Sequence, residues 1–552
     1  MGQTTQNTLP DTYYLDYFNF LLDFVFKNYS DILCAREKIF YDNFRNLSFS
    51  AQCMFVRFAN RKGVFFRESK LVYQEIENIG LSIEELCRNN FVSYDNIDQT
   101  ENHLFLFTKP EIISIGKARG WDTCYKKSQK KEDIIFSIIE QIDHSDINAA
   151  LFDEDRIIFF ESEELVNFYK LLFFGDQYND MTQFVIRDIG NIKLENLENV
   201  TFTPNFSSRA EVDDYLTVSA AYRVFKELKE LVSPLKCYQW FTDQEIVVDP
   251  PYSSRPGKMY VKLILKLAKL LEQHGFNLEA LDIYLKINVS PARERQVRLY
   301  SKLNEPEKAT MIAEQILECP HNASETLFAK DFLNAGTNRI KRSTTLTLKS
   351  ANEITLERDP QTSVEHLAVA YFVENGFEAY HTENSLWRFL FGLLFWEETY
   401  DTELSTFHHP LQRLPSDIHD ISFYDKRADA INAKLKTVRT RKVFIEKIKD
   451  TYHAKLGIAH GYIYWSDDLL KLALKAIELL PLKGLKEVLK MIAIQVKSNT
   501  TGFPDLFIFR NKSYYFYEIK SPTDQLSAQQ LFWIDFMNKW NIRSEVLKVT
   551  WK

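Results

Sequence analysis

Three side chains able to do acid, base or metal chemistry lie close together near the end of the chain. Residues 503–520 contain two runs rich in aromatic and β-branched residues around a polar pair, a pattern that predicts a β-hairpin with a short turn. Side chains alternate along a strand, so Glu518 and Lys520 point to one face, and the hairpin returns that end of the second strand to Asp505. Two carboxylates and one ammonium would therefore share a small site.

This combination of groups suits metal-assisted hydrolysis of a phosphodiester. Carboxylate oxygens are hard ligands of the kind that Mg²⁺ or Mn²⁺ prefers. Such a metal lowers the pKa of a bound water and neutralises charge at phosphorus, while a lysine can donate to the water or to the developing negative charge. The spacing of the three residues alone also fits a surface hairpin that carries an ordinary ion pair.

The wider sequence around the hairpin carries a resemblance. Pro504-Asp505 followed by Glu518-x-Lys520 resembles the active site of the PD-(D/E)xK nuclease superfamily. The continuation into Leu526-Ser527-x-x-Gln530 and a following Trp is similar to the VRR-NUC form of that site, and Ser527 is expected to cap the helix. The resemblance implies a catalytic role for Gln530, whose amide could reach the lysine or a phosphate; a solvated helix residue is the alternative.

Composition sets the broad class of protein. A chain of 552 residues predicts about three or four domains, and 45% hydrophobic content provides for sizeable cores. The net charge of −8 means that binding to nucleic acid must depend on local basic patches. Six cysteines without a Cys-x-x-Cys pair predict reduced thiols in a cytoplasmic protein. The polar first six residues predict no signal peptide, and the apolar window 386–396 is too short to span a membrane.

Two basic segments in the first third of the chain are candidate DNA contacts. Residues 54–70 interleave basic and aromatic residues and predict a helix-turn unit, and residues 104–142 predict helix, loop, helix, with Ser128 capping the second helix. The second helix is similar to that of a SAP module, a small binder of the DNA backbone. A solvated basic face and a helical hairpin with a basic loop are the alternatives. The candidate contacts are Arg61, Lys62, Arg67, Lys70, Lys117, Lys126, Lys127 and Lys131.

The middle of the chain predicts stacked helices. Residues 152–201 predict short linking helices, and residues 213–333 carry helix pairs that resemble a degenerate tetratricopeptide array. A basic loop at 253–258 precedes the array, and Arg255 and Lys258 within it are candidate phosphate contacts, although solvated charge is the simpler explanation.

The last domain combines an acidic site with basic flanks. Residues 384–396 predict a buried helix, and Glu383 just before it either complements the helix dipole or acts as a third metal ligand. Residues 426–449 hold nine basic and two acidic residues, which fits capture of phosphates around a metal site. The histidines at positions 408, 409 and 419 lack a zinc spacing and receive no role.

Nearly the whole chain resembles a bacterial member of the Fanconi anaemia-associated nuclease family. The matching pieces are the Tyr14-Leu15 opening, the segments 61–71, 254–257 and 381–396, the SAP-like hairpin, the helical array and the terminal Asp-Glu-Lys core. The resemblance implies a nuclease that cuts 5′-flaps in branched double-stranded DNA, trims 5′ to 3′ and assists DNA repair, including interstrand crosslink repair.

The same resemblance implies the ligands of the metal and the place of action. It implies Mg²⁺ or Mn²⁺ held by Glu383, Asp505, Glu518 and the backbone carbonyl of Ile519, with Lys520 assisting the water. A cytoplasmic, nucleoid-associated protein with no membrane partner is expected, and protein partners could dock on the helical array. We find no Cys-x-x-Cys ubiquitin-binding zinc finger of the kind that eukaryotic members carry.

The expected fold is multidomain and mostly α. We expect a helical N-terminal DNA-binding domain at 1–103, a SAP-like module at 104–144, a helical linker at 145–212, a tetratricopeptide-like helical array at 213–344, and an α/β PD-(D/E)xK nuclease domain with a mixed sheet at 345–552. The alternatives are a four-way junction resolvase or restriction-like nuclease, a DNA-binding scaffold without catalysis, and a helical-repeat adaptor unrelated to DNA.

Overall fold

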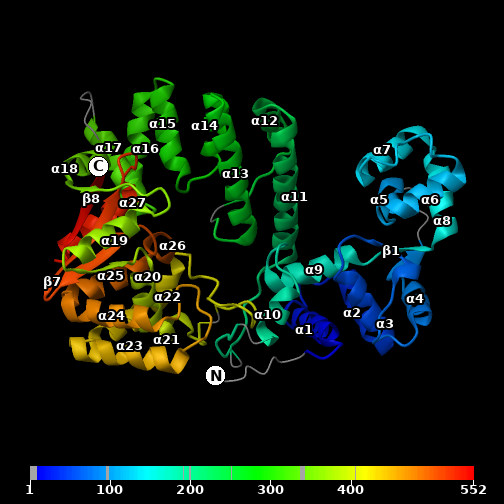
Figure 1. Cartoon of the computed structure of the whole chain (residues 1–552), viewed down its shortest axis with the longest axis horizontal. Coiled ribbons are helices and arrows are strands. Elements are labelled where there is room, and N and C mark those ends of the chain that lie inside the picture. The colour runs from blue at the N-terminus through cyan, green and yellow to red at the C-terminus, as the bar shows by residue number, and fades with distance from the viewer. Residues whose placement is uncertain are drawn as a thin grey trace. The chain divides into compact units, whose positions relative to one another are not determined.

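The computed structural model describes residues 9–94, 99–189, 192–197, 200–249, 252–335, 342–404 and 406–552. The prediction about the first six residues lies outside this part of the chain. The chain divides into two compact units (Figure 1). Unit 1 comprises Met1–Asn191 with Pro204–Arg209, and unit 2 comprises Ile192–Thr203 with Ala210–Lys552.

Unit 1 is mainly helical. Its helices are α1 (Tyr13–Asn28), α2 (Ala35–Arg45), α3 (Phe49–Ala59), α4 (Ile79–Arg88), α5 (Thr100–Phe105), α6 (Lys109–Arg119), α7 (Lys131–Gln141), α8 (His144–Glu154), α9 (Glu163–Phe174) and α10 (Thr182–Asp188), with a 3₁₀ turn η1 (Glu68–Lys70). Aromatic side chains pack α1 and α3 together: Phe18 lies against both Phe44 and Phe55 with ring centroids 5.2 and 5.7 Å apart.

A small antiparallel sheet completes unit 1 and corrects the prediction for residues 152–201. Its strands β1 (Phe65–Arg67), β2 (Val92–Tyr94) and β3 (Ile157–Phe160) are ordered β1-β3-β2. The prediction of short helices was right for α9 and α10 but wrong for 157–160, where four consecutive apolar, β-prone residues form the central strand. The helix-turn prediction for 54–70 likewise missed β1.

The SAP-like region is a helical module between β2 and β3. Thr108 and Glu111 form a capping box at the start of α6, and Gly120 ends that helix with a φ of 75°. Isoleucines of α6 and α7 fill its core. The prediction that Ser128 caps the second helix was wrong: α7 begins at Lys131 after Lys130, without a side-chain cap.

Unit 2 begins with stacked helices. They are α11 (Arg209–Leu231), α12 (Pro234–Asp243), α13 (Arg255–Gln273), α14 (Asn277–Leu285), α15 (Ala292–Lys302), α16 (Pro306–Glu318) and α17 (Ala323–Ala335). From α12 onward each helix packs against the next, as the green helices of Figure 1 show. The basic loop predicted at 253–258 was wrong in part, because α13 starts at Arg255 and Ser254 caps it by accepting from Gly257 N at 3.1 Å.

The nuclease-like part of unit 2 is built around a five-stranded mixed sheet. Its helices are α18 (Ser343–Ser350), α19 (Val364–Glu374), α20 (Ser385–Leu394), α21 (Trp396–Thr399), α22 (Ser422–Thr437), α23 (Arg441–Lys455), α24 (Asp467–Leu479), α25 (Leu482–Ile494), α26 (Val496–Asn499) and α27 (Ala528–Lys539). Its strands are β4 (Asn352–Leu356), β5 (Glu378–His381), β6 (Leu506–Arg510), β7 (Ser513–Lys520) and β8 (Ser544–Trp551), in the order β4-β8-β7-β6-β5. Strands β4, β8 and β7 are parallel, and β6 pairs antiparallel with β7 and β5.

Both faces of this sheet are covered. Leu506 and Ile508 of β6 pack on α19, whereas Phe507 and Phe509 belong to the large cluster that contains α20, α25 and α27. Alternate residues of one strand thus enter two different cores, which explains why β6 reads as a continuous apolar run. The two-sided burial fixes the strand register, because a slip of one residue would exchange its side chains between the two cores.

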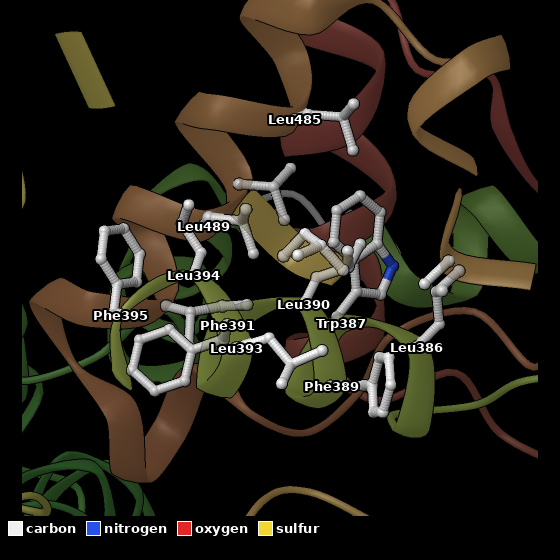
Figure 2. Close-up of a cluster of buried hydrophobic side chains, with 14 of the residues drawn as sticks. Leu386, Trp387, Phe389, Leu390, Phe391, Leu393, Leu394, Phe395, Leu485 and Leu489 are labelled. Carbon is white, nitrogen blue, oxygen red and sulfur yellow. The ribbon is translucent and has the colours of Figure 1, made fainter. Parts of the chain in front are cut away.

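The helix predicted at 384–396 lies at the centre of the larger core. Figure 2 shows Trp387, Leu390 and Leu394 of α20 facing Leu485 and Leu489 of α25. Trp387 is 1% exposed, and its ring stacks on Phe503 with centroids 5.4 Å apart. This helix therefore lies directly against the segment that leads into β6. No helix in the described part of the chain is long and apolar enough to cross a membrane.

A glycine at a close approach in α25 gives a test of this packing. A Cβ at Gly484 would lie 2.7 Å from the carbonyl oxygen of Trp540, so Gly484→Ala should destabilise unit 2 by about 1–3 kcal/mol despite the better helix propensity of alanine. Thermal unfolding measures the change. Gly80→Ala in α4 is the matched control: its Cβ would meet only Asn78 Oδ1 at 3.6 Å, and it should leave stability equal or slightly higher. Equal melting temperatures for the two variants would contradict the packing.

Candidate active site

The β6–β7 pairing positions the two acidic groups of the hairpin. Leu506 pairs with Tyr517, so Asp505 lies opposite Glu518 at the open end of the hairpin. Asp505 Oδ2 accepts a hydrogen bond from the backbone N–H of Ile519 at 2.8 Å, which ties its carboxylate to β7. The predicted hairpin is confirmed, and Asn511 in its two-residue turn adopts a positive φ of 57°, as such tight turns require.

Glu518 and Lys520 lie on the same face of β7, as the alternation predicted. Lys520 Nζ contacts Glu518 Oε1 at 2.8 Å, and the two residues are only 8% and 1% exposed. Gln530, in the first turn of α27, donates from Nε2 to the same Oε1. The other oxygen, Glu518 Oε2, is buried and has no hydrogen-bond partner among the described residues. One oxygen of this carboxylate is thus held in place while the second is left open.

Gln530 makes a contact that the sequence did not predict. Its Oε1 accepts from Ser527 N at 2.9 Å, and its backbone N–H donates to Ser527 Oγ at 3.2 Å, so the two residues form a capping box at the start of α27. The amide therefore joins the helix end to Glu518, whereas the sequence predicted a contact with the lysine or a phosphate. The predicted cap at Ser527 is present.

Glu383 lies at the edge of the same site. The backbone N–H groups of Thr382 and Glu383 donate to the carbonyl oxygen of Asp505 at 2.8 and 3.0 Å. Glu383 has a positive φ of 38°, an uncommon conformation for this residue type that directs the chain from β5 into α20. Its side chain is exposed and accepts from Asn384 Nδ2 at 2.9 Å.

Burial and like charge dominate the electrostatics of the site. Burial raises the pKa of Asp505 to about 6, against the opposing effects of the Ile519 N–H and Lys520. Burial and the neighbouring Asp505 raise the pKa of Glu518 to about 8, although Lys520 opposes this shift. One ammonium therefore does not compensate the carboxylates, and the site favours either a bound proton or an additional cation.

A further acid of this site escaped the sequence analysis. Glu365, in the first turn of α19, lies close enough to raise the pKa of Asp505. In the sequence it is an acidic residue after the helix cap Ser363, which has a sufficient explanation in the helix dipole. Its proximity to Asp505 follows only from the packing of α19 on the sheet, so no local signal could have found it.

The donor set fits a divalent cation in its chemistry. Half-buried Asp505 and buried Glu518 supply carboxylate oxygens, the unpartnered Oε2 of Glu518 is an open ligand position, and the raised pKa values mark uncompensated negative charge. Among the described residues, however, no three His, Cys, Asp or Glu side chains are grouped closely enough to hold a metal. Glu383 is engaged by Asn384 rather than joined to the other two carboxylates.

The predicted DNA contacts of unit 1 divide into two groups. The side chains of Lys62, Lys117, Lys126 and Lys127 are exposed and form no ion pair with the described residues, and Arg61 is exposed above the Tyr73 ring. Arg67 is placed differently: its side chain is 9% exposed and pairs with Asp155 and Glu111, both at 2.9 Å. Lys70 also contacts Glu111, at 3.3 Å, and Lys131 donates to Phe105 O at 2.8 Å. Arg67 thus serves the fold of unit 1.

Several basic residues of unit 2 also form ion pairs with acidic residues of the same unit. Lys258 contacts Asp420 at 3.2 Å, and Arg255 lies in the first turn of α13. In the basic stretch 426–449, Arg427 is buried and pairs with Asp417 at 2.9 Å, and Lys434 pairs with Glu397 and Glu398. These partners show that a count of basic residues overstates the positive charge available at the surface.

The fold and the site together define a class. A core of one helix, three strands, one helix and one strand (α19, β5, β6, β7, α27 and β8), with the helices α20 to α26 inserted between β5 and β6, carries Asp505, Glu518 and Lys520 at the open end of the central hairpin. This is the arrangement of a PD-(D/E)xK nuclease.

Comparison with known proteins agrees with this class and narrows it. The family described as "FAN1, HTH domain" matches residues 12–93, and the VRR-NUC domain matches residues 440–551. A Fanconi-associated nuclease 1 homolog of Pseudomonas aeruginosa is 26% identical over 98% of this chain and 97% of its own length. The Arabidopsis thaliana homolog is 24% identical over 96% of this chain and 66% of its own length. The human protein is 29% identical over 35% of this chain and 20% of its own length.

Solved structures show the same fold over the whole chain. The structure described as paFAN1 bound to 2nt 5′flap DNA with gap superposes with a TM-score of 0.84, at 24% identity and 99% coverage of both chains. The chain is therefore similar to the Fanconi-associated nucleases over nearly its whole length, as its sequence indicated. It is therefore a nuclease, and nucleases of this family are metal-dependent in general.

The raised pKa of Glu518 predicts how stability depends on pH in EDTA. A carboxyl whose folded pKa of about 8 exceeds its ordinary value of 4.5 binds a proton more tightly when folded, so stability falls as pH rises through this window. Glu518→Gln should therefore melt higher than the unmodified protein at pH 8.5, by about 2 kcal/mol or roughly 3 °C for a unit of this size, and the gap should close near pH 4.

Exposed Glu545→Gln in β8 is the control for this experiment, and it should show no such pH-dependent gap. Differential scanning calorimetry measures both variants. A gap of equal size at both pH values would show that the effect does not come from titration of Glu518.

Proposed function

We propose that this protein is a structure-specific DNA nuclease that cuts 5′-flaps in branched duplexes, trims 5′ to 3′, and serves DNA repair, including interstrand crosslink repair. The observation that carries the proposal is the grouping of half-buried Asp505 with buried Glu518 and Lys520, with one open carboxylate oxygen, inside this family's fold. The 5′-flap DNA bound in the structurally similar protein supports the choice of substrate. On this proposal the chain acts on chromosomal DNA in the bacterial cytoplasm.

The residues of the site have distinct tasks in the proposed reaction. Asp505, Glu518, Glu383 and the carbonyl of Ile519 would hold Mg²⁺ or Mn²⁺, which supplies an activated water and neutralises charge at phosphorus. Lys520, held by Glu518 at 2.8 Å, donates toward the attacking water or the phosphate oxygens. The N–H of Ile519 orients the Asp505 carboxylate, and Gln530 orients that of Glu518. Asn384 engages one carboxylate oxygen of Glu383, Oε1, which leaves Oε2 as the oxygen that would take part.

The proposal also assigns DNA contacts and a protein-docking surface to the rest of the chain. We assign backbone contacts to the exposed Lys62, Lys117, Lys126 and Lys127, and we keep Arg61 and Arg255 as candidates. The finer division into five domains and protein docking on the helical array also belong to this proposal. A four-way junction resolvase and a non-catalytic scaffold are the competing functions. The resolvase would prefer to cut a four-way junction, and the scaffold would bind branched DNA without cutting it.

The first test is cleavage of a labelled 5′-flap duplex in Mg²⁺, Mn²⁺ or EDTA, with 3′-flap and four-way junction controls. Metal-dependent cutting near the 5′-flap junction is expected, and Asp505→Asn should lower its rate by on the order of a thousandfold because it removes a ligand charge. DNA affinity in EDTA should change less than about threefold. Unchanged cutting by Asp505→Asn would overturn the site, and preferred cutting of the junction would favour a resolvase.

Gln530 should act as a positioning residue. Gln530→Ala removes the donor that holds Glu518 Oε1 and should lower the cutting rate by about 10–100-fold, with more metal needed for half-maximal rate. Titration of Mg²⁺ against rate measures both effects. Gln525→Ala, an exposed amide in the loop before α27, is the control and should leave both values unchanged. A lower rate with an unchanged metal requirement would place Gln530 in folding alone.

A further inference from the structure

A basic hollow lies at the end of the β6–β7 hairpin that is remote from the candidate active site. It has a volume of about 620 Å³ and is lined by Arg441, Lys512 and Arg543, with the polar side chains of Ser513, Asn538 and Asn541. None of its lining residues is acidic. Three cations without a carboxylate among them attract an anion, and a hydrated groove suits a phosphate of a polymer better than a buried small molecule.

The cations of the hollow are placed by separate elements. Arg441, the first residue of α23, donates to the carbonyl oxygen of Leu480 at 2.9 Å, and Arg543, just before β8, lies over the Tyr515 ring at 5.6 Å from its centroid. Lys512 occupies the hairpin turn. All three are exposed, and none forms an ion pair with a described residue, so their charge faces solvent.

A row of lysines joins this hollow to the active site. Helix α25 begins after Pro481, which lines the hollow, and leads through α26 to the segment that enters β6 at Asp505. Lys483, Lys490 and Lys497 recur at seven-residue intervals along it, which places the two on α25 on one side of that helix. Lys483 and Lys497 are exposed and Lys490 is half-buried. One acid, Glu487, interrupts the positive row on α25.

The distance from the hollow to the active site can be expressed in base pairs of a duplex. From Ser513 to Lys520 the strand β7 advances seven residues, or roughly 23 Å. One DNA strand advances 3.4 Å per base pair, so this length corresponds to about seven base pairs. On a duplex arm that runs along this surface, the hollow would thus lie about seven base pairs from the active site.

We infer that Lys483, Lys490 and Lys497 together with the hollow of Arg441, Lys512 and Arg543 form a basic track, along which the backbone of a duplex arm runs to a phosphate anchor about seven base pairs from the cut. The inference rests on the proposed action on branched DNA. The inference goes beyond the proposed function by identifying the surface of the nuclease-like part that would hold one duplex arm. It also predicts a minimum length of that arm for tight binding.

The test compares Lys512→Ala/Arg543→Ala with the control Lys266→Ala/Lys269→Ala, which removes two exposed lysines of α13 that lie outside the track and form no ion pair with a described residue. Binding to a flap with arms of 20 base pairs is measured in EDTA at several salt concentrations. The track variant should bind about tenfold more weakly, with a salt slope smaller by about 2, while the control stays within about twofold. Thermal unfolding checks that both variants fold.

Arm length gives the decisive comparison. When each arm is shortened in turn to 5 base pairs, the tenfold difference should vanish for one arm and remain for the other. Equal affinities of the track variant and the unmodified protein on long arms, an equal loss in the control, or a difference that ignores arm length would each overturn the track. Failure of the proposed function can be told apart from failure of the track. In that case the unmodified protein would cut no branched substrate, whether or not the track variant binds DNA more weakly.

Discussion

The closeness of Asp505 and Glu518 is the constraint on which the site depends. The β6–β7 ladder places them opposite each other, where water solvates them poorly and a single ammonium compensates them only in part. Such an arrangement opposes folding unless the surrounding structure enforces it. The sheet enforces it, since the two cores pack against alternate residues of β6 and a slip of one residue would exchange these side chains between the cores.

Elements remote from the hairpin hold the same site by backbone contacts. The turn after β5 donates two N–H groups to the Asp505 carbonyl, and Trp533 of α27 donates from Nε1 to Thr501 O at 3.0 Å. Arg388 of α20 donates to the neighbouring Thr500 O at 2.7 Å. The segment before β6 is therefore fixed from both sides by helices of the larger core. Rigid support of this kind keeps the Asp505 and Glu518 carboxylates in a fixed arrangement.

Local patterns predicted the hairpin, the cap at Ser527, the buried α20 and the helices of the array, because each follows from periodicity or capping within about a dozen residues. Contacts between distant segments were beyond such patterns. The partners of Arg67 and the approach of Glu365 to Asp505 depend on how elements pack. The strand β3 was missed because four apolar residues between helices carry little periodicity. The contact of Gln530 with Glu518 was not predicted because the two residues belong to different elements, α27 and β7.

The small sheet of unit 1 has a consequence for how this unit can be assembled. Its central strand β3 follows the whole SAP-like module in the chain, whereas its outer strands β1 and β2 precede that module. During synthesis the two outer strands emerge without a partner between them, and the sheet closes only after the module has left the ribosome. Both ends of the module are therefore anchored in one sheet. A break in the chain anywhere within the module would leave the middle strand joined to its neighbours only by non-covalent pairing.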